Sequence, residues 1–227
     1  MNNSARQKGF VAPPLLIGGV AVVLIIVFLV ATGALKFSGS IRVDDQNKPR
    51  ENTQSVSDNN TPTATPTEKP KPSVKLFSEP FADAKLGFSV SYPEGWKVRE
   101  DTSAVTFFKP SETKGADQAD ALVSIVSGAL GELKDTKLAT IADLHKVYIK
   151  KQFDNVEFTG ETDVKVNSQD GYELEFTGSV KGEKMHARYI VLKGDKYLYA
   201  IIGMANTGLW DNEKETIEAS VQTFKIQ

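Results

Sequence analysis

An uncharged segment from Phe10 to Leu35 constrains this chain more than any other feature. Its centre reads LLIGGVAVVLIIVFLV, and nothing later in the sequence is comparably apolar. About 20 consecutive apolar residues are enough to cross a bilayer as a helix. We therefore predict one transmembrane helix over residues 10–36, which anchors the chain in the cell membrane. Because long downstream domains are translocated largely regardless of charge, residues 1–9 form a cytoplasmic tail and the C-terminal part is extracytoplasmic.

The same segment has two other interpretations. Arg6 and Lys8 precede the apolar run and small residues stand at 32–34, as in a cleaved signal peptide, but the apolar part of a signal peptide is only about 7–15 residues long. The residues QKGF at 7–10 resemble the cleavage site of type IV prepilin-like proteins, which are cut after the glycine. That family has Glu at the fifth mature position, where this chain has Pro14. An anchor fits best, and a pilin-like or other envelope-assembly component processed after Gly9 is the alternative.

Residues 37–75 have the composition of a linker. Asn, Ser, Thr, Asp and Pro dominate, and the densest part reads TPTATPTEKPKPS. Such a segment has too little apolar area to offset the entropy of ordering it, and its prolines favour extended conformations. We predict a disordered spacer over 37–75, followed by one α+β domain over 76–227.

Charge and cysteine content exclude several classes of function. Residues 76–227 carry 18 Lys and Arg against 24 Asp and Glu, whereas residues 1–75 carry an excess of basic residues. An acidic domain argues against nucleic acid as a partner and against a domain that lies flat on anionic lipid. The chain has no cysteine, which excludes disulfides, a thiolate nucleophile and a cysteine-based metal site.

The pattern of apolar residues predicts strands interrupted by two helices. Alternation favours strands at 87–92, 96–99, 104–109, 121–127, 156–159 and 163–166. Between them, Ile141, Leu144, Tyr148 and Ile149 recur at helical spacing over 140–153, with Thr140 as the N-cap. A second helix is expected over 209–224, where Trp210, Ile217, Val221 and Phe224 recur. This order predicts an antiparallel sheet with helices on it.

The segment 172–205 reads as a three-stranded meander with turns at 181–184 and 194–195. The expected pairs are Phe176–Tyr189, Leu174–Val191 and Val180–Met185 across the first turn, and Tyr189–Ala200, Val191–Leu198 and Ala187–Ile202 across the second. All of these residues share one apolar face. The other face is mixed, with Glu173, Glu175, Thr177, Arg188, Ile190, Tyr199 and Ile201, and we expect a helix to cover part of it.

Two segments of this domain resemble the PsbP-like superfamily, which includes DcrB-type bacterial envelope domains. They are GFSVSYPEGWKV at 87–98 and the C-terminal LWDNEKETIEASVQTFKI at 209–226. The resemblance covers about 76–227. It implies an antiparallel sheet sandwiched by helices and a binding or assembly role without catalysis, cofactor or metal.

The residues that could carry chemistry are few. Only His145 and His186 are available as histidine bases, and neither belongs to a hydrolase motif, so a hydrolase stays a remote alternative. His145 is expected on the surface of the first helix. On the mixed sheet face, Glu173, Glu175, His186 and Arg188 are a candidate ligand-binding patch, although a solvated ion pair between Glu175 and Arg188 also explains them. Trp96 is expected to be a core residue that follows the turn at 93–95.

Taken together, the sequence predicts a single-pass membrane protein whose extracytoplasmic PsbP-like domain binds a protein partner in the cell envelope. It predicts no catalytic residue.

Overall fold

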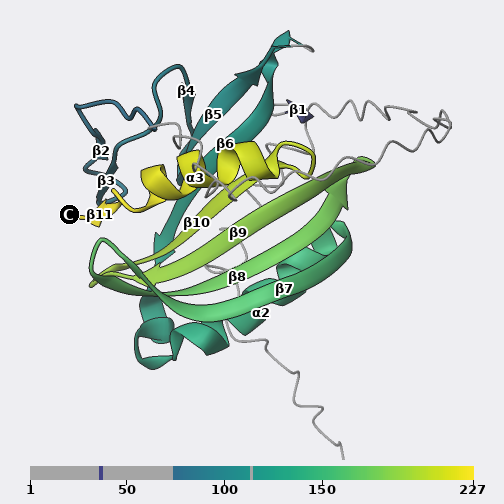
Figure 1. The fold of residues 1–227 in the computed structure, drawn as a ribbon. Helices are drawn as coiled ribbons and strands as arrows, with labels where there is room; N and C mark the ends of the chain where they lie inside the picture. The colour runs from purple at the N-terminus through teal and green to yellow at the C-terminus, as the bar shows by residue number, and fades with distance from the viewer. Residues whose placement is uncertain (1–35, 38–73, 113–114) are drawn as a thin grey trace, which may run out of the picture.

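The computed structural model describes residues 36–37, 74–112 and 115–227 (Figure 1). The processing site at Gly9, nearly all of the predicted anchor over 10–36 and most of the predicted spacer over 37–75 lie outside these residues. Within the described ranges, no helix is long and apolar enough to cross a membrane.

The main element is a large twisted sheet (Figure 1). Its order is β4 (Lys97–Glu100), β5 (Ala104–Ser111), β6 (Gly115–Ala129), β10 (Tyr197–Asn206), β9 (Glu183–Lys193), β8 (Gln169–Val180) and β7 (Asp154–Val166). These neighbours are all antiparallel, and β1 (Lys36–Phe37) pairs with β6 in parallel. A second sheet contains β11 (Lys225–Ile226), β3 (Phe88–Val90) and β2 (Phe81–Asp83).

Helices cover both faces of the large sheet (Figure 1). The short helix η1 (Gly131–Asp135) leads into α2 (Leu138–Gln152), which packs on one face, and α3 (Trp210–Val221) and the small sheet pack on the other. Each face has its own apolar core. The predicted α+β architecture, an antiparallel sheet sandwiched by helices, is therefore confirmed for the described residues. The small sheet was not predicted, because β2 and β11 are too short to show a period.

The meander has the predicted faces but not the predicted pairs. Leu174 lies opposite Tyr189 and Phe176 opposite Ala187, so the first hairpin is shifted by two residues from the prediction. The reason is its turn: Lys181 and Gly182 both have positive φ (53° and 84°), which is typical of a two-residue turn. In the second hairpin the shift has the opposite sense, and Tyr189 lies opposite Ile202. A shift of two preserves the side-chain alternation, so the apolar residues stay on the α2 face.

Helix α2 begins earlier than predicted and presents a different face. Its N-cap is Lys137, so Thr140 lies inside the first turn. The buried positions are Ile141, Ala142, His145 and Ile149, whereas Leu144 is 44% exposed. The prediction that His145 lies on the surface is therefore wrong: Ile141, His145 and Ile149, four residues apart, form the stripe that faces the sheet.

Helix α3 approaches the large sheet closely at one point. Gly203 in β10 lies beneath Ile217 of α3, and a Cβ atom on residue 203 would overlap Ile217 Cγ2. The absence of a side chain at Gly203 therefore lets α3 lie close to the sheet at Ile217.

Candidate functional site

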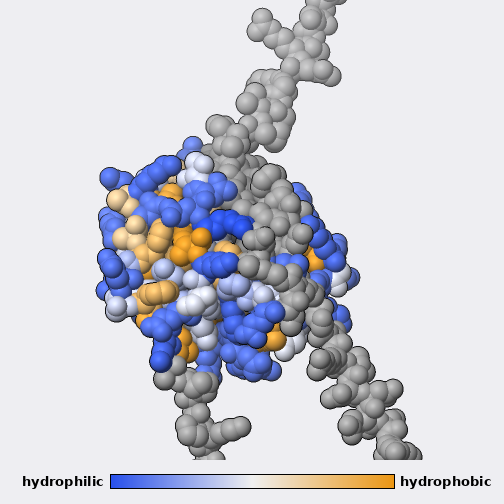
Figure 2. Space-filling view, turned by 90° about the horizontal axis from the view of Figure 1, so that it is seen from above, coloured by the Kyte–Doolittle hydropathy of each residue, from blue (hydrophilic) through white to orange (hydrophobic). Residues whose placement is uncertain are grey.

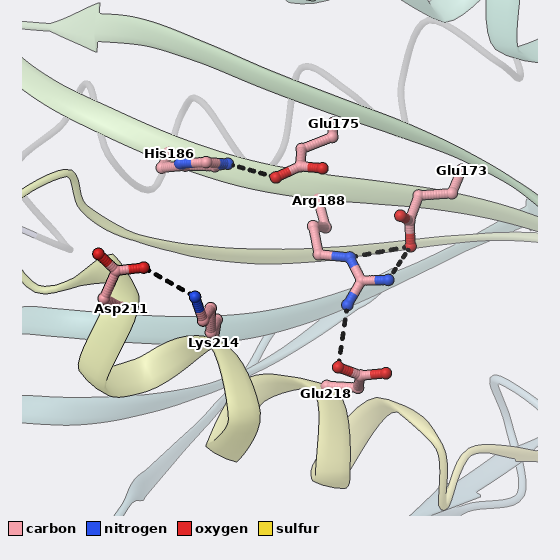
Figure 3. Close-up of polar contacts among 7 residues, drawn as sticks. All are labelled: Glu173, Glu175, His186, Arg188, Asp211, Lys214 and Glu218. Atoms are coloured by element: carbon pink, nitrogen blue, oxygen red, sulfur yellow. Dashed lines mark hydrogen bonds and ion pairs between the residues drawn. The ribbon is translucent and has the colours of Figure 1, made fainter. Parts of the chain in front are cut away.

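The four residues predicted as a ligand-binding patch come together on β8 and β9, on the side that faces α3 (Figure 3). Glu175 lies directly opposite Arg188 in the register, but the ion pairs run diagonally. Arg188 donates from Nε to Glu173 Oε2 at 3.0 Å, and its Nη2 lies 2.7 Å from the same oxygen. His186 Nε2 lies 2.6 Å from Glu175 Oε1. The predicted pair of Glu175 with Arg188 is thus replaced by two neighbouring pairs.

Helix α3 completes this group from the other side (Figure 3). Glu218 Oε2 lies 3.4 Å from Arg188 Nη1, and Lys214 Nζ donates to Asp211 Oδ1 at 2.8 Å. The indole of Trp210 stacks on the imidazole of His186, with ring centroids 4.1 Å apart and planes within 8°. We call these eight residues the polar cluster: Glu173, Glu175, His186, Arg188, Trp210, Asp211, Lys214 and Glu218.

The charges of the polar cluster stabilise one another. Burial of the Arg188 guanidinium acts to lower its pKa, but the hydrogen bond to Glu173 and the charges of Glu173, Glu218 and Glu175 outweigh burial, so the pKa of Arg188 is raised. The hydrogen bond from Lys214 lowers the pKa of Asp211. These interactions favour the charged forms of Arg188 and Asp211, which suits a surface that presents charge. Whether it binds a ligand stays a prediction.

The other histidine has a structural position. His145 Nδ1 lies 2.8 Å from the Tyr189 hydroxyl, and both residues are buried beneath α2. Burial lowers the pKa of His145 to about 4 and raises the pKa of Tyr189, so both side chains are neutral at pH 7. Among the described residues, no group of three or more His, Cys, Asp or Glu side chains is arranged to hold a metal ion.

A groove on the far side of α3 was missed by the sequence analysis. Its volume is about 490 Å³, and its lining comes from the segments around 74–75 and 93–96, from β5 and from α3. The lining residues are Val74, Lys75, Pro93, Glu94, Trp96, Lys109, Asn212, Glu213, Glu215 and Thr216. We call it the Trp96 groove. No motif marks it, because its residues come from four separate segments that only the tertiary fold brings together.

An ion pair connects two sides of this groove. Lys109 Nζ on β5 donates to Glu213 Oε1 in the first turn of α3 at 2.7 Å, and the side chain of Glu213 is only 9% exposed. These residues are 104 positions apart in the sequence. Helix α3 therefore separates two polar regions, with the polar cluster along one side and the Trp96 groove along the other.

The surface around these sites mixes hydrophilic and hydrophobic residues (Figure 2). Seen from above, hydrophobic side chains gather among charged ones at the left, where Figure 1 places β2 and β3. Phe77, which is 39% exposed, contributes an aromatic ring 4.7 Å from that of Tyr92, next to Pro93 of the groove.

Comparison with known proteins gives a family and a fold. The family model for PsbP-like proteins matches residues 19–226. The solution structure of cyanobacterial PsbP (CyanoP) from Synechocystis sp. PCC 6803 is similar to this chain, with a TM-score of 0.51 and 18% identity, and the match covers 71% of this chain and 98% of that one.

Two further solved structures are more distant. A protein of unknown function, PA94 from Pseudomonas aeruginosa, has a TM-score of 0.46 at 12% identity, covering 68% of this chain and 97% of that one. LpqN, described as involved in cell envelope biogenesis of Mycobacterium tuberculosis, has a TM-score of 0.45 at 12% identity. The match covers 67% of this chain and 91% of that one. No curated protein matches this chain.

Proposed function

We propose, from the premise that this chain belongs to the PsbP-like protein family, that it is a membrane-anchored, extracytoplasmic binding or assembly module of the cell envelope that works without catalysis. The uncharged run from Phe10 to Leu35 supports the anchor, and the Pro- and Thr-rich segment after it supports a spacer that holds the domain away from the bilayer.

The observation that carries the binding role is the Trp96 groove. Its volume of about 490 Å³ falls in the usual range for ligand sites, which is about 300–1,000 Å³. Its lining joins three apolar residues, Val74, Pro93 and Trp96, to five charged and two polar ones, so it is more polar than a typical small-molecule site. The groove also includes Val74, so it lies where the proposed spacer joins the domain.

The positions of the histidines favour binding over hydrolysis. A hydrolase of the serine type needs a nucleophile hydrogen-bonded to a histidine that an acid orients. His145 is bonded to a tyrosine in the core, and His186 is held between Glu175 and the Trp210 ring. Neither of these bonds joins a histidine to a serine nucleophile, which a hydrolase of this type requires.

Membrane extraction tests the anchor. After lysis, the full-length protein should remain in the membrane fraction through washes with high salt and with alkaline carbonate. Full release into the soluble fraction would contradict the anchor and indicate cleavage of the N-terminal segment. A mature N-terminus at Phe10 would instead support the pilin-like alternative.

Crosslinking and pull-down of the full-length protein from its own membranes test the binding role. We expect a protein partner to be captured by the wild type and by Val147→Trp, which changes an exposed site on α2. Asn212→Trp, at an exposed position that lines the groove, should reduce capture. Equal capture by both variants would exclude the groove as the site, and no capture by the wild type would contradict the proposed function.

A further inference from the structure

Strand β6 extends past its neighbour β10 at one end. It begins at Gly115, but β10 pairs with it only from Ala121 to Ala129. On the opposite side, β5 continues along β6 as far as Gly115. Strand β10 therefore leaves one edge of residues 115–120 uncovered. Such an edge presents backbone N–H and C=O groups that pair readily with another extended segment.

Strand β1 lies on this edge of β6 (Figure 1). Lys36 is opposite Gln118, and the two strands run in parallel. Phe37 is opposite Ala119, which pairs with Pro110 of β5 on its other side. Ala119 is fully buried in the core of the α2 face, so the packing of the domain itself holds this part of the edge in place. The edge is thus formed independently of β1, and β1 is an added strand.

The position of β1 in the sequence ties this pairing to the membrane. The uncharged run ends at Leu35, directly before Lys36. Neighbouring strands lie only about 4.8 Å apart, so an anchor that ends at Leu35 brings the N-terminal end of β6 to the bilayer surface. Because β1 and β6 are parallel, the anchor approaches from the side of the β5–β6 turn. Glu112, which is exposed at this turn, then faces the bilayer.

The same pairing determines whether the proposed spacer can act. The segment 38–73 begins next to β1 and ends at Val74, which lines the Trp96 groove. While β1 is paired, both ends of this segment are therefore on the domain, and its length does not separate the domain from the bilayer. The segment can do so only when β1 leaves β6.

The β1–β6 pair is short enough to open. Strand β1 has two residues, whereas strands usually have about 3–10. Parallel pairs are also slightly less stable per residue than antiparallel ones. Pairing closes the chain between Phe37 and Val74 into a loop, and closure of a long loop costs conformational entropy. Few backbone bonds are set against this cost, so local opening of β1 requires little free energy.

We propose that the β1–β6 pair is a juxtamembrane latch, an inference that rests on the membrane anchor proposed above. In the closed latch, β1 holds the domain at the bilayer with the β5–β6 turn towards it. In the open latch, the segment 38–73 becomes the spacer, and the domain can reach a partner farther from the membrane. The latch thus sets how far the binding module extends into the envelope.

Paired cysteines test the closed latch, because the chain has none of its own. Residues opposite each other on neighbouring strands have a Cα separation within the range that a disulfide bridges, about 4.4–6.8 Å. We expect Lys36→Cys with Gln118→Cys to form an intramolecular disulfide when full-length protein in its own membranes is treated with a mild oxidant. Mass spectrometry of the linked peptides identifies the bond.

A matched cysteine pair measures what the tether alone would give. Thr162 is exposed on β7, the strand at one edge of the large sheet. Lys36→Cys with Thr162→Cys should be oxidised at least about tenfold more slowly than the pair at 36 and 118, because only residues held opposite each other have a high effective concentration.

Lipid quenching tests where the domain lies. A fluorophore is attached to Glu112→Cys, or to Asp195→Cys in the β9–β10 turn, which lies beside the C-terminal end of β6. Both positions are exposed. Lipids with paramagnetic headgroups should quench the label at position 112 and not the label at position 195.

Proline variants test whether β1 holds this position. Lys36→Pro with Phe37→Pro removes both backbone donors of β1 and should abolish the quenching at position 112. Ser57→Pro with Asp58→Pro makes the same change within the segment 38–73 and should retain the quenching.

Three outcomes would overturn the latch. They are the absence of a disulfide between positions 36 and 118, equal oxidation rates for the two cysteine pairs, and quenching at position 112 that survives the prolines in β1. Each would leave the proposed function standing if the protein stays in the membrane through the carbonate wash. Loss of the wild type from the membrane fraction would instead contradict the proposed anchor, and the latch with it.

Discussion

The two faces of the large sheet treat polar side chains in opposite ways. Under α2, His145 and Tyr189 are buried and kept neutral by burial, and they hydrogen-bond to each other within an apolar core. Under α3, Arg188 and Glu173 are charged, and their ion pair continues to Glu218 on the helix. The polar pair under α2 is buried from solvent. The charged residues under α3 instead extend to the surface, and the Trp96 groove lies on the other side of that helix.

Under the proposed function, this difference assigns stability to one face of the sheet and recognition of a partner to the other. A neutral buried pair contributes to folding but offers nothing to a partner. Fixed charges on a rigid support cost more to assemble, yet they let a partner be recognised by its own charge. The four predictions below test how far this division holds, from the largest expected effect to the smallest.

Trp96, which lines the groove, should contribute as much to stability as a core residue does. Trp96→Ala should lower the free energy of unfolding by about 3–5 kcal/mol, the usual cost of removing a buried aromatic side chain. Thermal and denaturant unfolding of full-length protein in detergent measure this, with Phe77→Ala as a control at an exposed aromatic residue. Unchanged stability with loss of partner binding would make Trp96 a surface contact.

The free energy of unfolding should fall in acid because of His145, which is buried on the α2 face. Burial lowers its pKa from the ordinary 6.5 to about 4, so the unfolded chain takes up this proton more readily than the folded one. The stability gained from neutral His145 is therefore complete above pH 6.5 and is lost as pH falls toward 4, by about 3 kcal/mol in total. Unfolding measured at pH 7 and pH 4 should show this additional loss in the wild type and not in His145→Gln. The same loss in both proteins would contradict a buried neutral histidine.

Helix α3 should be sensitive to its distance from the sheet. Gly203→Ala puts a methyl group against Ile217, so overpacking should cost about 1–3 kcal/mol and shift the helix outward. Combining it with Ile217→Ala should recover part of that loss relative to the sum of the single variants. A double-mutant cycle measures the coupling, and strict additivity would mean that the two residues do not touch.

Two carboxylates of the polar cluster, Glu173 and Glu175, should contribute unequally to stability. Glu173, whose side chain is 8% exposed, makes both short contacts with Arg188, so Glu173→Gln should cost about 1.5 kcal/mol. Glu175 is 36% exposed, and Glu175→Gln should cost less than about 1 kcal/mol. Chemical denaturation of the two variants gives the comparison. Equal losses of unfolding free energy in the two variants would mean that burial does not distinguish the Glu173–Arg188 pair from the Glu175–His186 pair.

The sequence predicts which face of the sheet each side chain lies on better than it predicts which residues pair across neighbouring strands. Alternation places Leu174, Phe176 and Tyr189 on one face in both the predicted and the observed register, because the two differ by a shift of two residues, which leaves the pattern unchanged. The partner of each residue depends on turn conformation, and the positive φ values of Lys181 and Gly182 are not visible in an alternating pattern. Periodicity also misplaces His145, since Leu144 is the more apolar neighbour and yet faces solvent.

The candidate sites show the same limit. Glu173, Glu175, His186 and Arg188 are found together because one hairpin carries all four. The contribution of Trp210 and Glu218, and the whole Trp96 groove, depends on how α3 crosses the sheet. No local pattern reports a contact such as Lys109 with Glu213, which tertiary packing alone creates.

Site-specific photo-crosslinking in native membranes tests the central claim most directly. A photoreactive phenylalanine analogue is placed at Thr216, which lines the groove on α3, or at Val147, which is 53% exposed on α2. We predict that the full-length protein crosslinks to one protein partner from position 216 and not from position 147. A crosslink from position 147 alone, or equal crosslinking from both positions, would contradict the assignment of binding to the α3 face.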